Sequence, residues 1–313
     1  MAEINDLIII GGGPAGLTAA QYAGRSNLKV LLFEELSPGG QAIIIDGLEN
    51  YPGFPEAVSG FDFSQKMEKQ ARKFGCEILN TGVSGVSRIS EEEGFLVETT
   101  SGEFKSRAII LSTGAKHRHL NIPGEKEFSG KGVSYCATCD GPFFRDKKIL
   151  VVGGGDAACD EAMYLSNLSD KIIMIHRKER FRAQKAIAER IIKNKNITVR
   201  FNTILKEIKG NDKVETAVLE KTDSKENYNE NFDAVFIFIG SIPQTALFPD
   251  LKKDEGGYLI TDQNMATEVP GLFVAGDVRA TPFRQIVVAA GEGAIAANSV
   301  SKYIDKLKGQ VYT

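Results

Sequence analysis

Residues 7–16 read LIIIGGGPAG and residues 149–158 read ILVVGGGDAA, and these two stretches decide the fold. Each begins with a short apolar run and passes directly into the pattern G-x-G-x-x-G/A. An apolar run bounded by glycine is typical of a strand that is buried on both faces of a parallel sheet. In the pattern itself, the first glycine permits a tight turn and the second lets the backbone approach a pyrophosphate. The third small residue lets the following helix lie close to the strand.

The residues after each turn complete a βαβ unit. Helix-length segments at 16–26 and 157–167 are followed by further apolar runs at 30–33 and 172–175, and the second turn begins 142 residues after the first. Strand, glycine-rich turn, helix and strand, occurring twice in register, predict an α/β protein with two Rossmann-like dinucleotide-binding domains. The candidate phosphate-binding residues are Gly11, Gly13 and Gly16 in the first turn and Gly153, Gly155 and Ala158 in the second.

The residue at the end of the second strand of each unit indicates which nucleotide binds, because the adenosine ribose is bound there. In the first unit it is Glu34, whose carboxylate can accept ribose hydroxyls and would repel a 2′-phosphate, which suits FAD. In the second unit it is His176, and a basic cluster follows that can hold a 2′-phosphate by charge-assisted hydrogen bonds. The cluster therefore favours NADPH over NADH. The other interpretation of these basic residues is that they form an ordinary solvated helix face. The basic cluster consists of Arg177, Lys178, Arg180 and Arg182.

Composition limits the classes of function. The chain has 313 residues, which at roughly 150 residues per domain suggests two domains. Its formal net charge is −3, and the sequence contains no long run of basic residues. Both features argue against a nucleic-acid partner. No apolar run approaches the roughly 18 residues of a membrane span, and the acidic start does not read as a secretory signal. We therefore expect a cytoplasmic protein with neither a membrane nor a nucleic acid as its partner.

A Cys-x-x-Cys motif, formed by Cys136 and Cys139, lies just ahead of the second unit. Asp140, Gly141 and Pro142 follow it, and they would end any helix after about one turn. Two thiols at this spacing can close a disulfide without long-range backbone movement, and a helix N-terminus or a nearby cation would stabilise the reactive thiolate. Asp140 could donate or accept a proton beside the pair. The motif is therefore a candidate redox centre.

Two other interpretations of this motif stay open. Zinc usually needs four ligands, and beyond the pair only His117 and His119 are candidates, both distant in sequence. Alternatively the pair could be two unpaired structural thiols. The remaining cysteines, Cys76 and Cys159, have no partner at short spacing, so we expect core or surface residues rather than catalysts. We expect no metal site.

Taken together, these motifs resemble those of the low-molecular-weight, bacterial-type thioredoxin reductases, and matching features extend from Gly11 to Gln285. The matching motifs are Cys-Ala-Thr-Cys-Asp at 136–140, His-Arg-Lys-x-x-x-Arg-Ala at 176–183, Gly-Gly-Gln at 39–41, Glu-Asn-Tyr-Pro-Gly at 49–53, Ser-Thr-Gly-Ala at 112–115, Gly-Asp-Val at 276–278 and Arg-Gln at 284–285. The resemblance implies that the second domain is inserted into the first. The FAD-binding domain would comprise residues 1–117 and 242–313, and the NADPH-binding domain, which carries the Cys-x-x-Cys, residues 118–241.

The resemblance also implies which residues bind the two cofactors. FAD would be held by Gly11, Gly13, Gly16, Glu34, Gly39, Gly40, Gln41, Asn50 and Thr113, with Asp277 on the ribitol side and Arg284, Gln285 and Ile286 near the ring. NADPH would be held by Gly153, Gly155, Ala158, His176, Arg177, Lys178 and Arg182. Two positions depart from the family pattern. Lys178 replaces an arginine and keeps the charge without the bidentate fork, and Ala157 replaces a hydroxyl residue.

The activity implied by the resemblance is reduction of the disulfide of thioredoxin or a thioredoxin-like protein by a homodimeric enzyme. Electrons would pass from NADPH to the flavin and then to the disulfide, with rotation of one domain on the other between the half-reactions. Cys139 would face the flavin, Cys136 would attack the disulfide of the partner, and Asp140 would be the general acid. The alternatives are a different donor (NADH or ferredoxin), a different acceptor (a glutaredoxin-like or peroxiredoxin-linked protein), and a flavin-bearing regulator that senses redox state.

Overall fold

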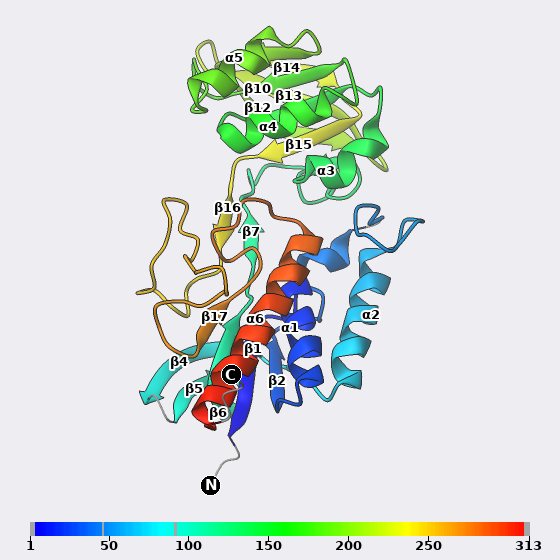
Figure 1. Ribbon diagram of the computed structural model, residues 1–313. Coiled ribbons are helices and arrows are strands. Elements are labelled where there is room, and N and C mark those ends of the chain that lie inside the picture. Colours follow the sequence, from blue (N-terminus) through cyan, green and yellow to red (C-terminus); the bar gives the residue numbers. More distant parts are fainter. Residues whose placement is uncertain (1–3, 46, 91–92, 310–313) are drawn as a thin grey trace. The chain divides into compact units, whose positions relative to one another are not determined.

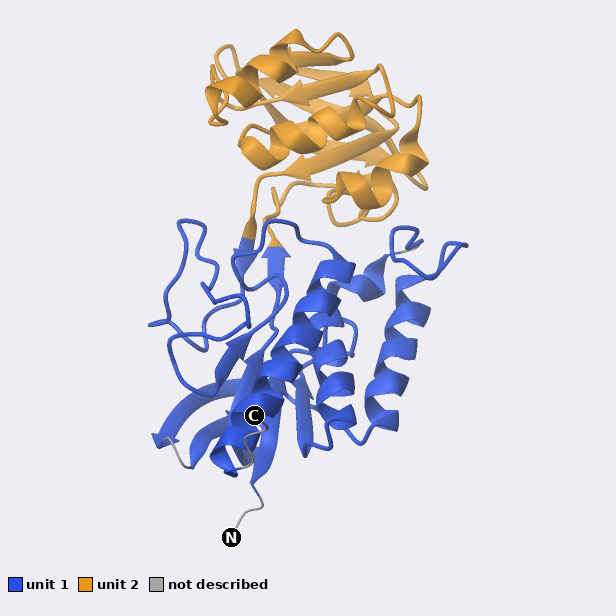
Figure 2. Cartoon of the chain, viewed as in Figure 1, with its two compact units in different colours: residues 1–116, 242–313 blue, residues 117–241 orange. Residues whose placement is uncertain are grey.

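The computed structural model describes residues 4–45, 47–90 and 93–309. The chain divides into two compact units, which consist of residues 1–116 with 242–313 and of residues 117–241 (Figure 2). The first unit is therefore discontinuous in sequence, and the chain crosses between the units twice. The two crossing segments, β7 (Ala115–His117) and β16 (Ser241–Pro243), pair with each other.

A seven-stranded sheet is the framework of the first unit (Figure 1). Its order is β3-β2-β1-β6-β5-β4, and β17 pairs with β6 outside this path. The pairs among β3, β2, β1, β6 and β17 are parallel, whereas β5 and β4 are joined antiparallel. The long strand β6 pairs with β5 through residues 102–106 and with β17 through residues 109–111. The strands are β1 (Asn5–Ile10), β2 (Val30–Glu34), β3 (Glu77–Asn80), β4 (Val83–Ser90), β5 (Gly94–Thr99), β6 (Gly102–Leu111) and β17 (Leu272–Val274).

Helices cover one face of this sheet. Helix α1 (Pro14–Arg25) packs against both α2 (Gly60–Lys73) and α6 (Ile286–Leu307), as Figure 1 shows, and the short 3-10 helix η1 spans Gly40–Ile44. Successive residues of a strand point to opposite faces, so in β1 Leu7 and Ile9 join the core under the helices. Ile8 and Ile10 join a second core on the other face. The uninterrupted apolar run of β1 follows from burial on both faces.

The second unit is built on a five-stranded parallel sheet in the order β11-β10-β9-β15-β8. Its core alternates in the same way, because Ile149 and Val151 of β9 pack under the helices while Leu150 and Val152 pack with the antiparallel sheet β12-β13-β14. The strands are β8 (Val133–Ser134), β9 (Ile149–Gly153), β10 (Ile172–Ile175), β11 (Ile197–Arg200), β12 (Thr203–Gly210), β13 (Val214–Lys221), β14 (Asn227–Asn231) and β15 (Ala234–Phe238). The helices are α3 (Ala137–Asp140), η2 (Gly141–Phe144), α4 (Asp156–Leu165) and α5 (Lys185–Lys193).

The two βαβ units predicted from the sequence are confirmed as β1-α1-β2 and β9-α4-β10, each inside a parallel sheet. The predicted helices differ from the observed ones by only a few residues at either end. Within the described ranges, none of the helices combines the length and the apolar composition that crossing a bilayer requires. The fold class is therefore α/β with two Rossmann-like units.

Candidate functional site

The first glycine-rich turn joins β1 to α1, and its three key glycines lie in different surroundings. Gly11 has φ +103°, and a Cβ there would lie 2.5 Å from the carbonyl oxygen of Ser112. A Cβ at Gly16 would lie 2.0 Å from the carbonyl oxygen of Gly11, so only glycine lets α1 approach the turn this closely. At Gly13 no described atom lies within 4 Å of an added Cβ. The turn is thus crowded by protein atoms at Gly11 and Gly16 and open at Gly13.

Glu34 lies beside this turn. One oxygen of its carboxylate accepts the N–H of Gly12 at 2.7 Å, and the other accepts the N–H of Leu36 at 3.1 Å. Both contacts hold the acidic group at the carboxyl end of β2, next to the end of β1, because the two strands are parallel neighbours. The structure therefore brings Glu34 and the first turn together.

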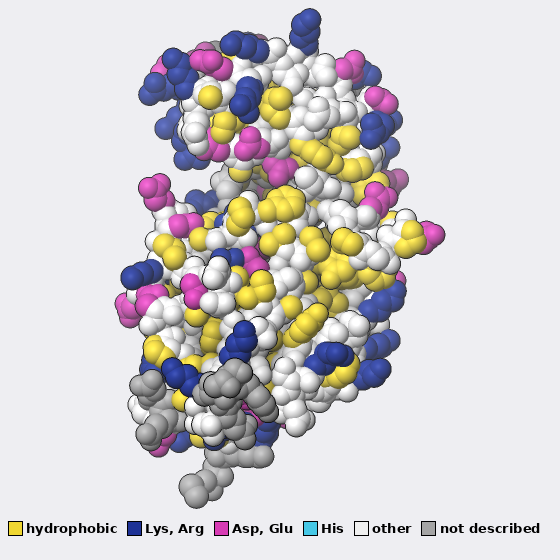
Figure 3. Space-filling view, in the orientation of Figure 1, with side chains coloured by type: hydrophobic (Ala, Val, Ile, Leu, Met, Phe, Trp, Pro, Cys, Tyr) yellow, Lys and Arg dark blue, Asp and Glu magenta, His cyan; other side chains and the backbone are white. Residues whose placement is uncertain are grey.

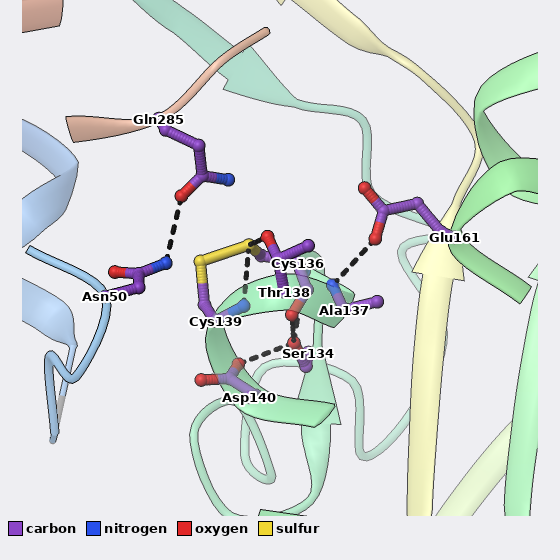
Figure 4. The surroundings of a disulfide bond; sticks show 9 residues. All are labelled: Asn50, Ser134, Cys136, Ala137, Thr138, Cys139, Asp140, Glu161 and Gln285. Atoms are coloured by element: carbon purple, nitrogen blue, oxygen red, sulfur yellow. Dashed lines mark hydrogen bonds between the residues drawn. A yellow bond between two sulfur atoms is a disulfide. The ribbon is translucent and has the colours of Figure 1, made fainter. Parts of the chain in front are cut away.

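The other residues expected at the flavin also lie in the first unit, and several of them make hydrogen bonds there. Gly39 donates its N–H to the carbonyl of Gly12 at 2.7 Å, and the side-chain amide of Gln41 donates to Ala115. Asn50 donates its side-chain amide to that of Gln285 at 3.1 Å, a contact also drawn in Figure 4. Further along, the Thr113 hydroxyl donates to the carbonyl of Gln244, Arg284 lies over the ring of Tyr258, and Ile286 begins α6.

Asp277 follows the parallel strand β17, and a buried ion pair supports its loop. Glu292 of α6 accepts the N–H of Gly276 at 2.8 Å and pairs with Arg279, whose Nε also donates to Thr261. Gly276 has φ +78°, so the carboxylate of Glu292 fixes a turn that favours glycine. Sequence reasoning missed Glu292 and Arg279. The available signal was a carboxylate within the otherwise apolar stretch Ala289–Ala297 of a helix.

The ionisation of Asp277 is disfavoured by its surroundings. Burial raises the pKa of this carboxyl from its ordinary value of 3.8 to about 6, and the charge of Glu292 adds to the rise while that of Arg284 opposes it. Hydrogen-bond donors that reach a half-buried carboxyl of this kind stabilise its ionised form.

The second glycine-rich turn joins β9 to α4 and repeats the pattern of the first. A Cβ at Gly153 would lie 2.5 Å from Ala158 and 2.6 Å from the carbonyl oxygen of Phe238, whereas no described atom lies within 4 Å of one at Gly155. Ala158 is buried. Asp156, the first residue of α4, accepts the N–H of Gln184 at 2.7 Å. This turn is likewise crowded by protein atoms at Gly153 and open at Gly155.

His176 and the basic residues after it take up different positions. His176 is buried beneath the turn, where a Cβ at Gly154 would lie 2.2 Å from its Nδ1. Its Nε2 has no hydrogen-bond partner among the described residues, and burial together with the nearby cations lowers its pKa. By contrast, Arg177, Lys178 and Arg182 are exposed, and the N–H of Arg182 donates to Gly154 at 2.7 Å. Arg180 is exposed as well, so the structure presents all four cations of the basic cluster on a loop tied to the second turn.

Cys136 and Cys139 form a disulfide, with their Cα atoms 5.3 Å apart (Figure 4). Helix α3 is a single turn, for which Cys136 is the N-cap and accepts the N–H of Cys139 on its Sγ at 3.2 Å. Ser134 donates its hydroxyl to Asp140 at 2.5 Å and accepts the N–H of Cys136 at 3.1 Å. Ser134, which sequence reasoning missed, therefore links the acid to the backbone of the redox pair.

A second residue that sequence reasoning missed is Glu161 of α4. Its Oε2 accepts the N–H of Ala137 at 3.1 Å, and Figure 4 shows this carboxylate directed at the first residue of α3. Burial raises the pKa of Glu161, whereas the hydrogen bond from Ala137 lowers it. The two residues are 24 positions apart in the sequence, so no local pattern links them.

The alternatives for the cysteines can now be compared with the structure. The described part of the chain contains no group of three or more histidine, cysteine or acidic side chains that could hold a metal. His119 lies 2.9 Å from the hydroxyl of Tyr135 and 3.4 Å from Glu125, and the ring of His117 stacks on Tyr135. Cys76 and Cys159 are buried, and burial raises the pKa of their thiols to about 12 and about 11. They are therefore poor nucleophiles, which leaves the disulfide pair as the redox candidate.

Comparisons with known proteins agree with this site. The family model for pyridine nucleotide-disulphide oxidoreductases matches residues 5–293. A thioredoxin reductase from Treponema pallidum is 50% identical over 303 residues, which is 97% of this chain and 98% of the relative. A crystal structure of thioredoxin reductase from Streptococcus pyogenes is 40% identical with a TM-score of 0.92, covering 98% of this chain and 100% of that one.

A crystal structure of thioredoxin reductase from Lactococcus lactis, described as the FR conformation, is 41% identical with a TM-score of 0.66 and covers 96% of this chain and 99% of that one. The likeness in sequence thus extends over nearly the whole of each chain. The region that the family model matches contains both glycine-rich turns and, between them in the sequence, the two cysteines. The protein belongs to the pyridine nucleotide-disulphide oxidoreductases and, within them, to the thioredoxin reductase family.

Proposed function

We propose that this protein is an NADPH-dependent flavoenzyme that reduces the disulfide of thioredoxin, with FAD in the first unit, NADPH in the second, and Cys136 and Cys139 as the dithiol. The observation that carries this proposal is the disulfide itself, which lies in the same unit as the second glycine-rich turn. Membership of the family implies the use of a flavin and a nicotinamide nucleotide. The identity of each is part of the proposal.

The residues of the first unit fit a bound FAD. Gly13 leaves open space beside the N-terminus of the 12-residue helix α1, whose macrodipole favours a pyrophosphate there. Glu34 would accept the ribose hydroxyls, and Asp277 would accept those of the ribitol. The remaining contacts would come from Gly11, Gly16, Gly39, Gly40, Gln41, Asn50, Thr113, Arg284, Gln285 and Ile286. When bound, the flavin supplies the two-electron carrier between the nicotinamide and the disulfide.

The residues of the second unit fit a nucleotide that carries an extra phosphate. Gly153, Gly155 and Ala158 would admit its pyrophosphate in the same way. Arg177 and Arg182 would hold the 2′-phosphate by charge-assisted hydrogen bonds, with Lys178 adding a point charge. His176, buried beneath the turn, would shape the site rather than pair with the phosphate, since its lowered pKa favours the neutral imidazole at pH 7.

The two cysteines would have distinct roles. Cys139 would exchange electrons with the flavin, and Cys136 would attack the disulfide of thioredoxin to form a mixed disulfide, which Cys139 then resolves. Asp140 would move the protons, since the dithiol must lose two of them as its disulfide forms. Ser134 would orient Asp140, because it donates to this carboxylate at 2.5 Å.

An Asp140→Asn variant should lower thioredoxin turnover by about a hundredfold, the lower limit of what general acid–base catalysis typically contributes. The amide oxygen can still accept the Ser134 hydroxyl, so the turn should keep its shape while losing its proton carrier. Steady-state assays across pH would measure the loss, with the exposed Asp146→Asn as the matched control. Turnover of Asp140→Asn within twofold of the parent at every pH would exclude this role.

A rotation between the units is part of the proposal, because the nicotinamide and the disulfide would have to reach one flavin in turn. Only two segments cross between the units, at 116–117 and 241–242. Two relatives of almost equal identity, 40% and 41%, give TM-scores of 0.92 and 0.66. Relatives equally similar to this chain in sequence therefore differ in how well their structures match it, which supports such a motion in the family.

Replacing Asp277 by asparagine should have opposite effects on the flavin-free and flavin-loaded protein. With a folded-state pKa of about 6 against 3.8, the folded protein retains a proton that the unfolded chain loses, so folding stability falls as pH rises between these values. Asp277→Asn removes this penalty. At pH 7 it should raise the unfolding free energy of the flavin-free protein by about 3 kcal/mol, with the gain shrinking toward pH 4.5.

The same variant should bind FAD more weakly, because an amide is a poorer acceptor for hydroxyl donors than a carboxylate. Thermal unfolding of the flavin-free protein at pH 7 and pH 4.5, together with FAD titration, would test both effects. A gain in stability that is equal at the two pH values would contradict the pKa argument.

The partners and location proposed from the sequence are thioredoxin, a second copy of this chain, and the cytoplasm. Exposed apolar side chains support the second copy, since Tyr22 of α1, Phe61 of α2, and Val287 and Ile295 of α6 are all more than a third exposed. Figure 3 shows hydrophobic side chains gathered over this helical face. A homodimer would have twice the 34.0 kDa mass of the chain in sedimentation equilibrium.

The function is tested by mixing the purified protein with NADPH or NADH, thioredoxin and a chromogenic disulfide. We expect sustained NADPH oxidation that requires thioredoxin, with NADH a poor substitute. Replacement of thioredoxin by a glutaredoxin-like protein, or of NADPH by reduced ferredoxin, tests the alternative acceptor and donor. Oxidation of no more than about two equivalents of NADPH per protein, followed by arrest, would contradict the proposal and favour a redox-sensing regulator.

A further inference from the structure

The dithiol turn is too short to hold its own shape. Helix α3 has four residues, and an isolated turn of this length is not stable, because nucleation fixes several residues for one hydrogen bond. The first N–H groups of a helix also have no partner within it. Here the N–H of Cys139 donates to the Sγ of Cys136, whereas the N–H of Ala137 donates to Glu161 of another helix.

The contact from Glu161 is well placed to act as an anchor. Ala137 is completely buried, so its N–H would be costly to leave without an acceptor. Glu161 belongs to α4, a longer helix that packs against α3 and buries Ala158, Cys159, Ala162 and Leu165 in the core of the second unit. The anchor thus joins the redox turn to a helix that packs on the core of the same unit, through an atom that does not belong to either cysteine.

This anchor becomes important when the disulfide opens. In the oxidised turn, the covalent bond keeps the two sulfur atoms together. On reduction that bond breaks, each sulfur gains one electron and one proton, and the geometry then depends on non-covalent contacts. The tendency of the dithiol to close again depends on how often the sulfurs meet, so a turn that loosens on reduction is a poorer reductant.

We propose that Glu161 is a positioning residue that keeps Cys136 and Cys139 together in the reduced state and thereby sets the equilibrium between dithiol and disulfide. The inference rests on the proposed function of the pair. Its readout, however, is the redox equilibrium of the two cysteines, which needs neither thioredoxin nor turnover. A protein that failed to reduce thioredoxin would contradict the proposed function and leave this measurement intact.

The test compares Glu161→Ala, Glu161→Gln and Asp160→Asn in the flavin-loaded protein. Asp160 is the adjacent carboxylate on α4 and is exposed, so its variant is the matched control for the loss of a charge. Each protein is equilibrated with mixtures of reduced and oxidised dithiothreitol, quenched in acid and alkylated. Mass spectrometry of the peptide that contains both cysteines then gives the fraction of disulfide.

Glu161→Ala should lower the equilibrium constant for closing the disulfide by about threefold to tenfold, where tenfold corresponds to about 30 mV for a two-electron couple. Glu161→Gln should stay within about twofold of the parent, because its amide oxygen can still accept the N–H of Ala137. Asp160→Asn should match the parent. An unchanged constant in Glu161→Ala would overturn the proposal, and so would an equal shift in Glu161→Gln, since the charge rather than the hydrogen bond would then act.

A second variant keeps the proposal testable if Glu161→Ala fails to fold. Ala137 is the first residue of α3, a position where proline is tolerated, and Cys136 before it has the extended backbone that proline requires (φ −144°, ψ 107°). Ala137→Pro removes the N–H donor and leaves the carboxylate. It should shift the equilibrium in the same direction as Glu161→Ala. A constant equal to that of the parent would overturn the anchoring role.

Discussion

Replacing either Cys136 or Cys139 by serine should lower the reduction of thioredoxin by about a thousandfold or more, because removal of a covalent nucleophile abolishes the route that depends on it. A serine hydroxyl can neither form a mixed disulfide nor carry the two electrons of the pair. Both variants should still bind flavin and stay yellow, since the cysteines and the proposed FAD residues belong to different units. Steady-state assays and flavin absorbance would measure the two properties on the same sample.

The matched controls for these variants are the other two thiols. Cys76 and Cys159 are buried, and the raised pKa values of about 12 and about 11 leave almost no thiolate at neutral pH. Cys76→Ala and Cys159→Ala should therefore keep the parent rate, apart from any loss through stability. Turnover at the parent rate in Cys136→Ser or Cys139→Ser would remove the dithiol assignment, whatever the controls showed.

A variant that lacks both Arg177 and Arg182 should lose about a hundredfold in kcat/KM for NADPH and less than about threefold for NADH. The reason is that hydrogen bonds to a charged group contribute about 1.5–3 kcal/mol, and only NADPH carries the 2′-phosphate. Both side chains are exposed and lie on the loop tied to Gly154. Initial rates with each nucleotide under the same conditions would give the ratio.

Two further variants sharpen this experiment. Arg190→Ala removes an exposed cation from α5 and should leave the ratio of NADPH to NADH unchanged. Lys178→Arg restores the planar fork that a lysine lacks, so it should raise the preference for NADPH a few-fold. Equal losses with NADPH and NADH in the double variant would show that the cluster is a solvated surface and not a phosphate site.

Much of the fold could be predicted because its signals are local. The apolar runs that became β1, β2, β9 and β10 are buried on both faces, and burial on both faces leaves an uninterrupted hydrophobic stretch in the sequence. The glycines of the two turns are equally visible, since no larger side chain fits at Gly11 or Gly16. The apolar runs and the glycine-rich turns were therefore enough to predict the two βαβ units.

The supporting residues of the site could not be predicted, because their partners are distant in the sequence. Glu161 meets Ala137 only because α4 packs beside α3, and Glu292 meets Gly276 only because α6 packs beneath the end of β17. His176 is a residue whose place in the sequence pattern did not predict its surroundings. Its position in the repeat indicated a ribose contact, but its side chain is buried under Gly154. The repeat gives the place of a residue at the end of a strand but not how deeply its side chain is buried there.

Counting the electrons that the protein accepts tests most directly whether one sulfur pair exchanges electrons with the bound flavin. An anaerobic titration with dithionite, followed by flavin absorbance, should need about two equivalents for the parent, since the flavin and the disulfide are each two-electron couples. The double variant Cys136→Ser/Cys139→Ser should need about one. A parent protein that is fully bleached by one equivalent, or a double variant that still needs two, would contradict the account.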